Sequence, residues 1–246
     1  MSRDSSIFLS IIIPAYNEEV RLPATLEQVA NFISLQPYTA EVLIVENGSQ
    51  DRTGQVAQEF AAQHPRFRVI QEAQRGKGLA VKSGMLQARG EYRFMCDADL
   101  SMPIEELNNF LPPIQAQFDI AIASREAPGS IRYHEPLHRH LGCRLINTMI
   151  RWLLLPGLQD TKCGFKCFRA GAAEELFRSQ SMFGWSFDIE LLYIARRRGC
   201  RIIEIPINWY YNPESKLNIF GDAIKMMADI LKIRQNGRRG LYDPRP

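Results

Sequence analysis

Two aspartates, Asp97 and Asp99, stand one residue apart directly after an apolar run, in the stretch RFMCDADLSMP of residues 93–103. In an extended segment their side chains point to the same side, so the two carboxylates repel each other. A divalent cation such as Mg²⁺ or Mn²⁺ would relieve this repulsion and could also hold a substrate diphosphate, because these ions prefer oxygen ligands. The alternative is a strand that simply ends in two solvated acids. The position of the pair beside two other polar loops favours the metal site.

A second phosphate-binding candidate is the glycine-rich stretch QRGKGLAVKSG of residues 74–84. It places Arg75 and Lys77 at the start of an expected helix, where backbone N–H groups favour an anion. The stretch is not a P-loop, because Val81 occupies the position before Lys82 that a P-loop fills with glycine. A flexible turn between a strand and a helix explains the glycines equally well.

Residues 134–138, HEPLH, match the zinc-protease pattern H-E-x-x-H. That chemistry needs both histidines on one face of a helix, with the glutamate between them. Pro136 disfavours a helical conformation for Glu135 and cannot lie inside a helix without breaking it. We therefore expect loop histidines here rather than a zinc hydrolase site.

The middle of the chain is rich in arginine, at Arg125, Arg132, Arg139, Arg144 and Arg151. Guanidinium groups are well shaped to grip phosphate, although a solvated basic face would have the same composition. The overlapping segment 145–158, LINTMIRWLLLPGL, is amphipathic. Together the two features favour an anionic partner with an apolar part, such as a phospholipid-like substrate.

Three further acids are candidates for the site. Asp160 precedes a turn of small residues and suits a pocket. Asp188 and Glu190 stand at the start of an expected helix, where acids often only complement the helix dipole. No Ser-His-Asp spacing and no catalytic-cysteine context stands out in the sequence.

The elements that must position these residues alternate along the first 100 residues. Apolar, β-branched runs predict strands, and apolar residues at helical spacing predict helices. The strands are expected at 8–14, 40–49, 66–73 and 91–99, and the helices at 17–34, 49–64 and 76–88. This alternation predicts an α/β fold, a Rossmann-like, mostly parallel sheet with helices on both faces. Ligands of such sheets bind at the carboxyl ends of the strands, and PAYNEE, ENGSQD and DADLS follow three of them.

The second half of the chain is expected to complete the sheet. Its predicted elements are strands at 119–126 and 201–211, a strand or turn at 160–169, and helices at 186–199 and 219–239. The last helix is apolar on one face and basic at its end. We divide the chain into a catalytic domain, 1–212, and an amphipathic, basic tail, 213–246.

Composition sets limits on the function. The 246 residues are 46% hydrophobic, and the net charge of +3 is too small to argue for nucleic acid as a partner. The five cysteines are an odd number in a chain of this size, which indicates reduced thiols in a cytosolic compartment. No segment reaches the roughly 20 apolar residues that span a bilayer, and the N-terminus does not resemble a signal peptide.

Six motifs in order then resemble family 2 glycosyltransferases of the GT-A fold: SIIIPAYNEE, VLIVENGSQDRT, RGKGLAVKSGM, CDADLS, ASRE and QDTKCGFKCF. The resemblance extends from about residue 11 to about residue 211 and is greatest to the polyprenyl- and dolichyl-phosphate glucosyl- and mannosyltransferases. It implies an inverting enzyme that moves a sugar, expected to be glucose from UDP-glucose, to a polyprenyl phosphate.

The resemblance also implies roles for particular residues. Asp97, Asp99 and Ser101 would form the metal site, with Asp97 and Asp99 near the diphosphate. Arg125 and Arg139 would hold the acceptor phosphate, and Asp160 would lie beside the reacting sugar. The nucleotide-sugar donor would be contacted by Pro14, Ala15, Tyr16, Glu18, Glu46, Asn47 and Lys77.

Several alternatives remain open at this point. The acceptor could be a soluble sugar or a growing polysaccharide, and the donor could be GDP-mannose. A protein that binds a nucleotide sugar without turnover would show similar motifs. Segment 145–158 and the tail are expected to dock on the cytoplasmic face of a membrane, with a membrane protein or a second copy of the chain as a further partner.

Overall fold

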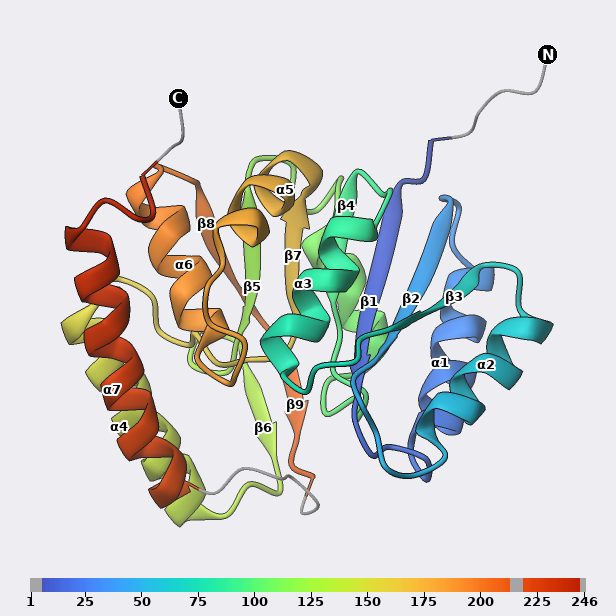
Figure 1. Cartoon of the computed structure of the whole chain (residues 1–246), viewed down its shortest axis with the longest axis horizontal. Helices are drawn as coiled ribbons and strands as arrows, with labels where there is room; N and C mark the ends of the chain where they lie inside the picture. Colours follow the sequence, from blue (N-terminus) through green and yellow to red (C-terminus); the bar gives the residue numbers. More distant parts are fainter. Residues whose placement is uncertain (1–5, 213–218, 244–246) are drawn as a thin grey trace.

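The computed structural model describes residues 6–212 and 219–243, and side chains from residue 225 onward in the second range. Its centre is a seven-stranded sheet in the order β3-β2-β1-β4-β7-β5-β8 (Figure 1). The strands are β1 (Leu9–Ala15), β2 (Ala40–Glu46), β3 (Phe67–Gln71), β4 (Tyr92–Met95), β5 (Ile120–Ser124), β7 (Lys166–Arg169) and β8 (Ile202–Pro206). Only β7 runs antiparallel to its neighbours in this sheet. The predicted α/β fold with a mostly parallel sheet is confirmed.

Helices cover both faces of the sheet. One face carries α1 (Leu22–Ser34), α2 (Thr53–Gln63) and the 3₁₀ helix η1 (Ile104–Phe110), and the other carries α3 (Lys77–Gln87), α5 (Ala170–Ser179) and α6 (Phe187–Arg197). Beyond β8, α4 (Leu137–Leu153) and α7 (Ile219–Arg238) lie side by side (Figure 1).

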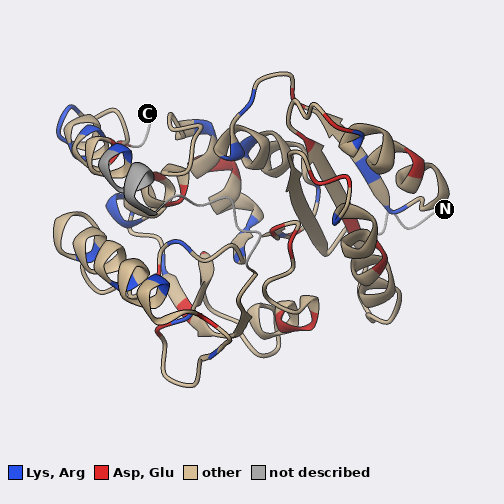
Figure 2. Cartoon of the chain, turned by 90° about the horizontal axis from the view of Figure 1, so that it is seen from below, with Lys and Arg blue, Asp and Glu red and all other residues tan. Residues whose placement is uncertain are grey.

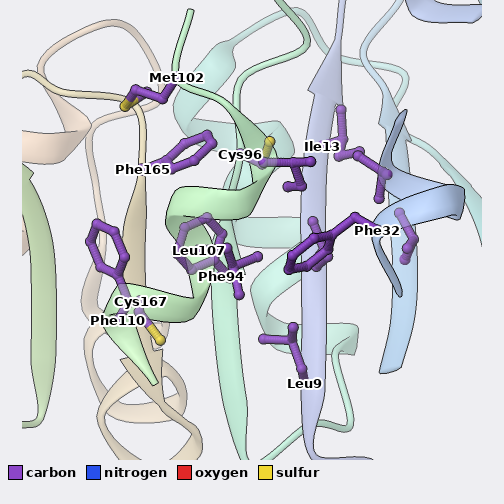
Figure 3. Close-up of a cluster of buried hydrophobic side chains, with 14 of the residues drawn as sticks. Leu9, Ile13, Phe32, Phe94, Cys96, Met102, Leu107, Phe110, Phe165 and Cys167 are labelled. Atoms are coloured by element: carbon purple, nitrogen blue, oxygen red, sulfur yellow. The ribbon is translucent and has the colours of Figure 1, made fainter. Parts of the chain in front are cut away.

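The strand pattern divides the core into two halves. Ile11 and Ile13 of β1 belong to the cluster under α1 and η1, whereas Ile12 belongs to the cluster under α3, α5 and α6. This alternation follows from the two-residue period of a strand that is buried on both faces. Figure 3 shows the first cluster, where Phe94 packs edge-on against Phe110 and Phe165 with ring centroids 5.3 and 5.0 Å apart.

The second half departs from the sequence-based expectation in three places. The segment 201–211 forms two strands in different sheets, because Pro206 ends β8 and β9 (Asn208–Tyr210) pairs in parallel with β6 (Ile131–Tyr133). Helix α5 was not predicted. Helix α4 begins at Leu137, eight residues before the amphipathic segment 145–158, and ends at Leu153.

The tail set apart at residue 213 begins outside the described residues, since 213–218 are not described. From Met226 onward, Met226, Ile230, Ile233 and Tyr242 are buried in the second core cluster. None of the described helices is long and apolar enough to cross a membrane. All five cysteines are free thiols.

Candidate active site

A cleft of about 410 Å³ opens at the carboxyl ends of β1, β2 and β4. Since β2 and β4 flank β1 on opposite sides, this is the topological switch point at which open α/β sheets bind their ligands. Residues predicted to bind the donor or the metal line this cleft: Pro14, Ala15, Tyr16, Glu18, Asn47, Lys77, Asp97 and Asp99. Three polar loops that are far apart in the sequence therefore share one cleft.

The two aspartates of DADLS have unequal partners. Lys77 Nζ lies 2.6 Å from Asp97 Oδ1, whereas Asp99 Oδ1 accepts a hydrogen bond from the backbone N of Ser101 at 3.1 Å. Burial and the charge of Asp97 raise the pKa of Asp99. The two carboxylates thus carry more negative charge than Lys77 compensates, and their oxygen donors fit a hard divalent cation.

A cation bound by this pair would have room for other ligands. Among the described residues, no three His, Cys, Asp or Glu side chains come together to hold a metal ion. Asp97 and Asp99 would therefore supply part of a coordination shell, and substrate oxygens would complete it. Magnesium commonly takes this arrangement, with one or two carboxylates and the phosphates of a nucleotide.

The glycine-rich turn before α3 forms one wall of the cleft. Arg75 lies over the ring of Tyr16, with its guanidinium carbon 4.4 Å from the ring centroid. Asn47 is buried, and its Oδ1 accepts a hydrogen bond from Gly76 N at 3.2 Å. The side chain that follows β2 therefore fixes the turn that carries Lys77 into the cleft.

Several of the predicted donor contacts also support the loops themselves, and Glu46 among them does not line the cleft. Glu46 Oε1 accepts a hydrogen bond from Ser49 N at 2.5 Å, and Glu18 forms an ion pair of 2.6 Å with Arg21. Asn47 N donates to the carbonyl of Ala15 at 3.1 Å. The loops after β1 and β2 thus hold each other in place.

Asp160 and Arg125 form a buried, bidentate ion pair. Arg125 Nε and Nη2 lie 2.7 and 3.0 Å from the two carboxylate oxygens of Asp160, which is fully buried. Burial alone would raise the pKa of Asp160, but the charge and hydrogen bonds of Arg125, with Asn147, hold it well below its usual range. In this structure the Asp160 carboxylate is therefore ionised and bound to Arg125.

Arg125 and Arg139, fourteen residues apart, each lie over an aromatic ring of the segment 209–211 at the end of β9. Arg125 lies over the ring of Trp209 at 5.4 Å and Arg139 over the ring of Tyr211 at 4.9 Å. Side chains two residues apart point to the same side of an extended chain. The two rings lie 6.2 Å apart, so the two arginines contact neighbouring aromatic side chains.

Asp188 lies in a buried cluster of lysines near the cleft. Its two carboxylate oxygens lie 3.0 Å from Lys166 Nζ and 3.4 Å from Lys162 Nζ. Burial alone would raise the pKa of Asp188, but Lys166, Lys162 and Lys77 hold it below its usual range. Glu190 is fully buried and faces elsewhere, toward Ser181 and Tyr242.

The HEPLH segment does not form a zinc site in the described part of the chain. His134 is a loop residue with φ of 60°, as expected, but His138 lies in the first turn of α4, so the prediction of two loop histidines was wrong for it. Pro136 is the N-cap residue of α4, where its missing N–H costs nothing. Glu135 instead binds Arg132 at 2.6 Å.

Two cleft residues were missed by sequence reasoning. Arg21 follows the PAYNEE motif by two residues, and its charge in a polar loop was an available signal. Trp185 stands in WSFDIELL, where only the acids were considered, and lies over 80 residues from the nearest other cleft segment in the chain. Only the packing of its loop onto the turn before α3 brings it into the cleft.

Comparisons with known proteins agree with this architecture. Residues 10–177 match the family described as Glycosyl transferase family 2. A dolichyl-phosphate beta-glucosyltransferase of Trichomonas vaginalis, ALG5A, is 35% identical over 97% of this chain and 76% of its own length. The human dolichyl-phosphate beta-glucosyltransferase is 35% identical over 92% of this chain and 74% of its own length.

Solved structures show the same fold at lower sequence identity. Glucosyl-3-phosphoglycerate synthase from Mycobacterium tuberculosis, in complex with UDP, superposes with a TM-score of 0.65 at 19% identity, over 92% of this chain and 80% of that one. The same enzyme with Mn²⁺, UDP-glucose and phosphoglyceric acid gives a TM-score of 0.64 at 18% identity, over 92% and 79%. With the sequence match across most of the chain, these findings confirm the resemblance: the chain is a GT-A-fold glycosyltransferase that belongs to family 2.

Proposed function

We propose that this enzyme transfers glucose from UDP-glucose to dolichyl phosphate or a related polyprenyl phosphate, with inversion at the sugar carbon. The similar proteins from Trichomonas, human and yeast are all described as dolichyl-phosphate beta-glucosyltransferases. At 32–36% identity they support the reaction type and the two substrates as a proposal for this chain.

The observation that carries the choice of acceptor is that Asp160 and Asp188, two acids considered for the site, are each paired with cations. A hydroxyl acceptor must lose a proton as it attacks, and an efficient general base has a pKa near the working pH. Asp160 and Asp188 have lowered pKa values instead, because Arg125 and the lysine cluster stabilise their charged forms. A phosphate acceptor is already an anion and needs positioning rather than a base. Two arginines placed for a phosphate, together with acids that are already paired with cations, support a phosphate acceptor over a sugar hydroxyl.

A divalent cation, Mg²⁺ or Mn²⁺, fits the donor end of the cleft. Asp97 and Asp99 would hold it, with Ser101 N fixing the orientation of Asp99. When bound, the cation would neutralise the charge that develops on the departing nucleoside diphosphate. Lys77 and Arg75 would supply additional positive charge at the start of α3, next to the phosphates.

The acceptor phosphate is assigned to Arg125 and Arg139. The buried Asp160 carboxylate holds the Arg125 guanidinium by an ion pair. The ring of Trp209 packs against Arg125, and the ring of Tyr211 packs against Arg139. Two guanidinium groups held in this way would orient a phosphate oxygen toward the sugar, with Asp160 as a positioning residue.

The apolar part of the acceptor requires access to a membrane surface, and α4 offers one. Its exposed apolar stripe consists of Leu137, Leu141, Leu145 and Trp152, at helical spacing and with exposed fractions of 56–80%. The helix carries three arginines and no acidic residue (Figure 2). We assign this stripe to the cytoplasmic face of an anionic membrane. It begins eight residues earlier than the segment 145–158 predicted from sequence, and the tail contact predicted from residue 220 lies partly outside the described side chains.

A radiolabel transfer assay tests the proposal. UDP-glucose and GDP-mannose would each be offered with a short polyprenyl phosphate or with a soluble sugar acceptor, in the presence of Mg²⁺, Mn²⁺ or EDTA. An organic-extractable glucosyl product that requires the cation is the expected result. Transfer to the sugar acceptor alone would contradict the assignment of the acceptor, and transfer from GDP-mannose alone would contradict the assignment of the donor.

A further inference from the structure

Trp185 is a large aromatic side chain that remains 42% exposed on the wall of the cleft. Lys77 Nζ lies 5.2 Å from the centroid of its ring and 2.6 Å from Asp97 Oδ1. The indole therefore stands beside the carboxylates and the lysine assigned to the diphosphate. The group that follows the diphosphate in a nucleotide sugar is the hexose.

The loop that carries Trp185 is fixed at its first residues by Glu190. The Glu190 carboxylate accepts hydrogen bonds from Ser181 N at 3.0 Å, from Met182 N at 2.8 Å and from the Tyr242 hydroxyl at 2.7 Å. Because Glu190 is fully buried and its charge is satisfied by these donors, this end of the loop has one defined position.

The middle of the loop packs directly on the glycine-rich turn. Gly78 N donates to the carbonyl of Phe183 at 2.9 Å, and a β-carbon on Gly76 would lie 2.6 Å from the same oxygen. A β-carbon on Gly78 would lie 2.7 Å from Phe187 Cβ. The two glycines around Lys77 thus permit the close approach of the loop that carries Trp185.

The far end of the loop is held by Lys162. Its Nζ donates to the backbone carbonyl of Trp185 and lies 3.4 Å from Asp188 Oδ2. The contact is to the backbone, so it fixes the main chain that carries the indole and does not cover the ring. Lys162 comes from the QDTKCGFKCF segment, which otherwise contributes the buried Asp160.

We infer that Trp185 is the platform for the hexose of the donor, and that Lys162 is the positioning residue that holds this platform in place. The inference rests on the proposed function and adds a contact that the donor makes only through its hexose. An aromatic ring packs well against the C–H face of a pyranose whose hydroxyls are equatorial, as in glucose.

The test compares the binding of UDP and UDP-glucose by calorimetry in the presence of Mn²⁺. UDP lacks the hexose, so the ratio of the two affinities isolates the sugar contact. Trp185→Ala is expected to reduce the affinity for UDP-glucose by about tenfold and to leave that for UDP unchanged. Trp185→Phe should keep most of the affinity, and Leu35→Ala, at an exposed leucine after α1, serves as the control.

The role of Lys162 is tested by the ratio of the affinities for UDP-glucose and UDP and by steady-state kinetics. Lys162→Met should raise the KM for UDP-glucose while the inhibition constant of UDP stays unchanged, and Lys162→Arg should restore the wild-type KM.

Two outcomes would overturn the inference: a wild-type protein that binds UDP-glucose no more tightly than UDP, or a Trp185→Ala variant that loses both ligands in parallel. Because the calorimetric assay contains no acceptor, the affinities that it measures are independent of the assigned acceptor. Sugar-selective binding without transfer to polyprenyl phosphate would leave Trp185 in its role and contradict only the proposed reaction.

Discussion

Gly164 lies against the carboxylate of Asp97 so closely that a β-carbon at residue 164 would overlap Asp97 Oδ2 and stand 2.6 Å from Asp97 Cγ. Asp97 follows β4, and Gly164 lies just before β7, its antiparallel neighbour in the sheet. The glycine therefore determines where the first carboxylate of the pair can point. It belongs to the site although it has no side chain.

Gly164→Ala is predicted to displace the Asp97 carboxylate from Lys77 and from the cation. We expect the affinity for Mn²⁺ together with UDP to fall by at least about tenfold, the effect typical of disturbing the support of a metal ligand. Calorimetry would measure it. Gly171→Ala is the matched control, because a β-carbon there meets no atom within 4 Å and alanine suits the α5 helix. Equal affinities of the Gly164→Ala and Gly171→Ala variants for Mn²⁺ with UDP would contradict the close approach of Gly164 to the Asp97 carboxylate.

Removal of the cation is predicted to abolish transfer. Asp97 and Asp99 carry charge that Lys77 alone does not balance, so the diphosphate of the donor would be repelled without a metal ion. EDTA should eliminate product, and added Mn²⁺ or Mg²⁺ should restore it. Asp99→Asn keeps the shape of the side chain but removes one charge, and should lower the transfer rate by about a hundredfold or more. Full activity in EDTA would exclude the metal site.

Removing one partner of the buried Arg125–Asp160 pair is predicted to destabilise the fold strongly. Asp160→Asn leaves the Arg125 guanidinium buried without its counter-ion, which should lower the free energy of unfolding by about 3–5 kcal/mol. Urea unfolding at pH 7 would measure the loss. Asp243→Asn is the control, because Asp243 pairs with Arg197 at the surface and such pairs contribute about 1 kcal/mol or less.

The Arg125–Asp160 pair should also make the free energy of unfolding depend on pH. The pKa of Asp160 in the folded protein is lowered by Arg125, so the folded state binds its proton less readily than the unfolded state does. The contribution of the pair is therefore complete above about pH 4 and decreases as the pH falls below that value. The difference in unfolding free energy between wild type and Asp160→Asn should shrink between pH 5 and pH 3. A constant difference would contradict the shift.

The sequence predicted the first half of the fold well because each strand there is a short apolar run closed by polar residues. The buried faces of β1, β2 and α1 follow directly from residue periodicity. The split of 201–211 into β8 and β9 could not be predicted in the same way. It depends on pairing with β5 and β6, which lie more than 70 residues earlier in the chain.

The candidate site was predictable where it consists of loops that follow strands, since the carboxyl ends of parallel strands meet at one edge. Burial was not predictable, because no local pattern distinguishes an Asp160 that faces solvent from one enclosed by Arg125 and Asn147. The place of Trp185 depends on the fit of its loop against Gly76 and Gly78. That fit is a tertiary contact between segments about 100 residues apart.

The apolar stripe of α4 is predicted to bind anionic vesicles. Exposed leucines on a helix whose charged residues are all arginines bury apolar area in the lipid interface and pair with negative head groups. Sedimentation with vesicles that contain phosphatidylserine should recover the wild-type protein at low salt and less of it at high salt, because the charge interaction is screened. Leu141→Ser combined with Trp152→Ser should reduce binding by about tenfold or more, since two large apolar side chains are removed from the interface.

A control variant and a transfer assay distinguish membrane docking by α4 from a role of α4 in catalysis. Leu35→Ser replaces a leucine that is 82% exposed at the end of α1 and should leave vesicle binding unchanged. The double variant of α4 should transfer glucose at the wild-type rate to a short acceptor dissolved in detergent, because Asp97, Asp99 and Lys77 are untouched. It should be slower only with acceptor embedded in vesicles. Equal vesicle binding by the double variant and the wild type would exclude α4 as the docking surface, and the exposed face of α7 around Leu231 would then be the next surface to substitute.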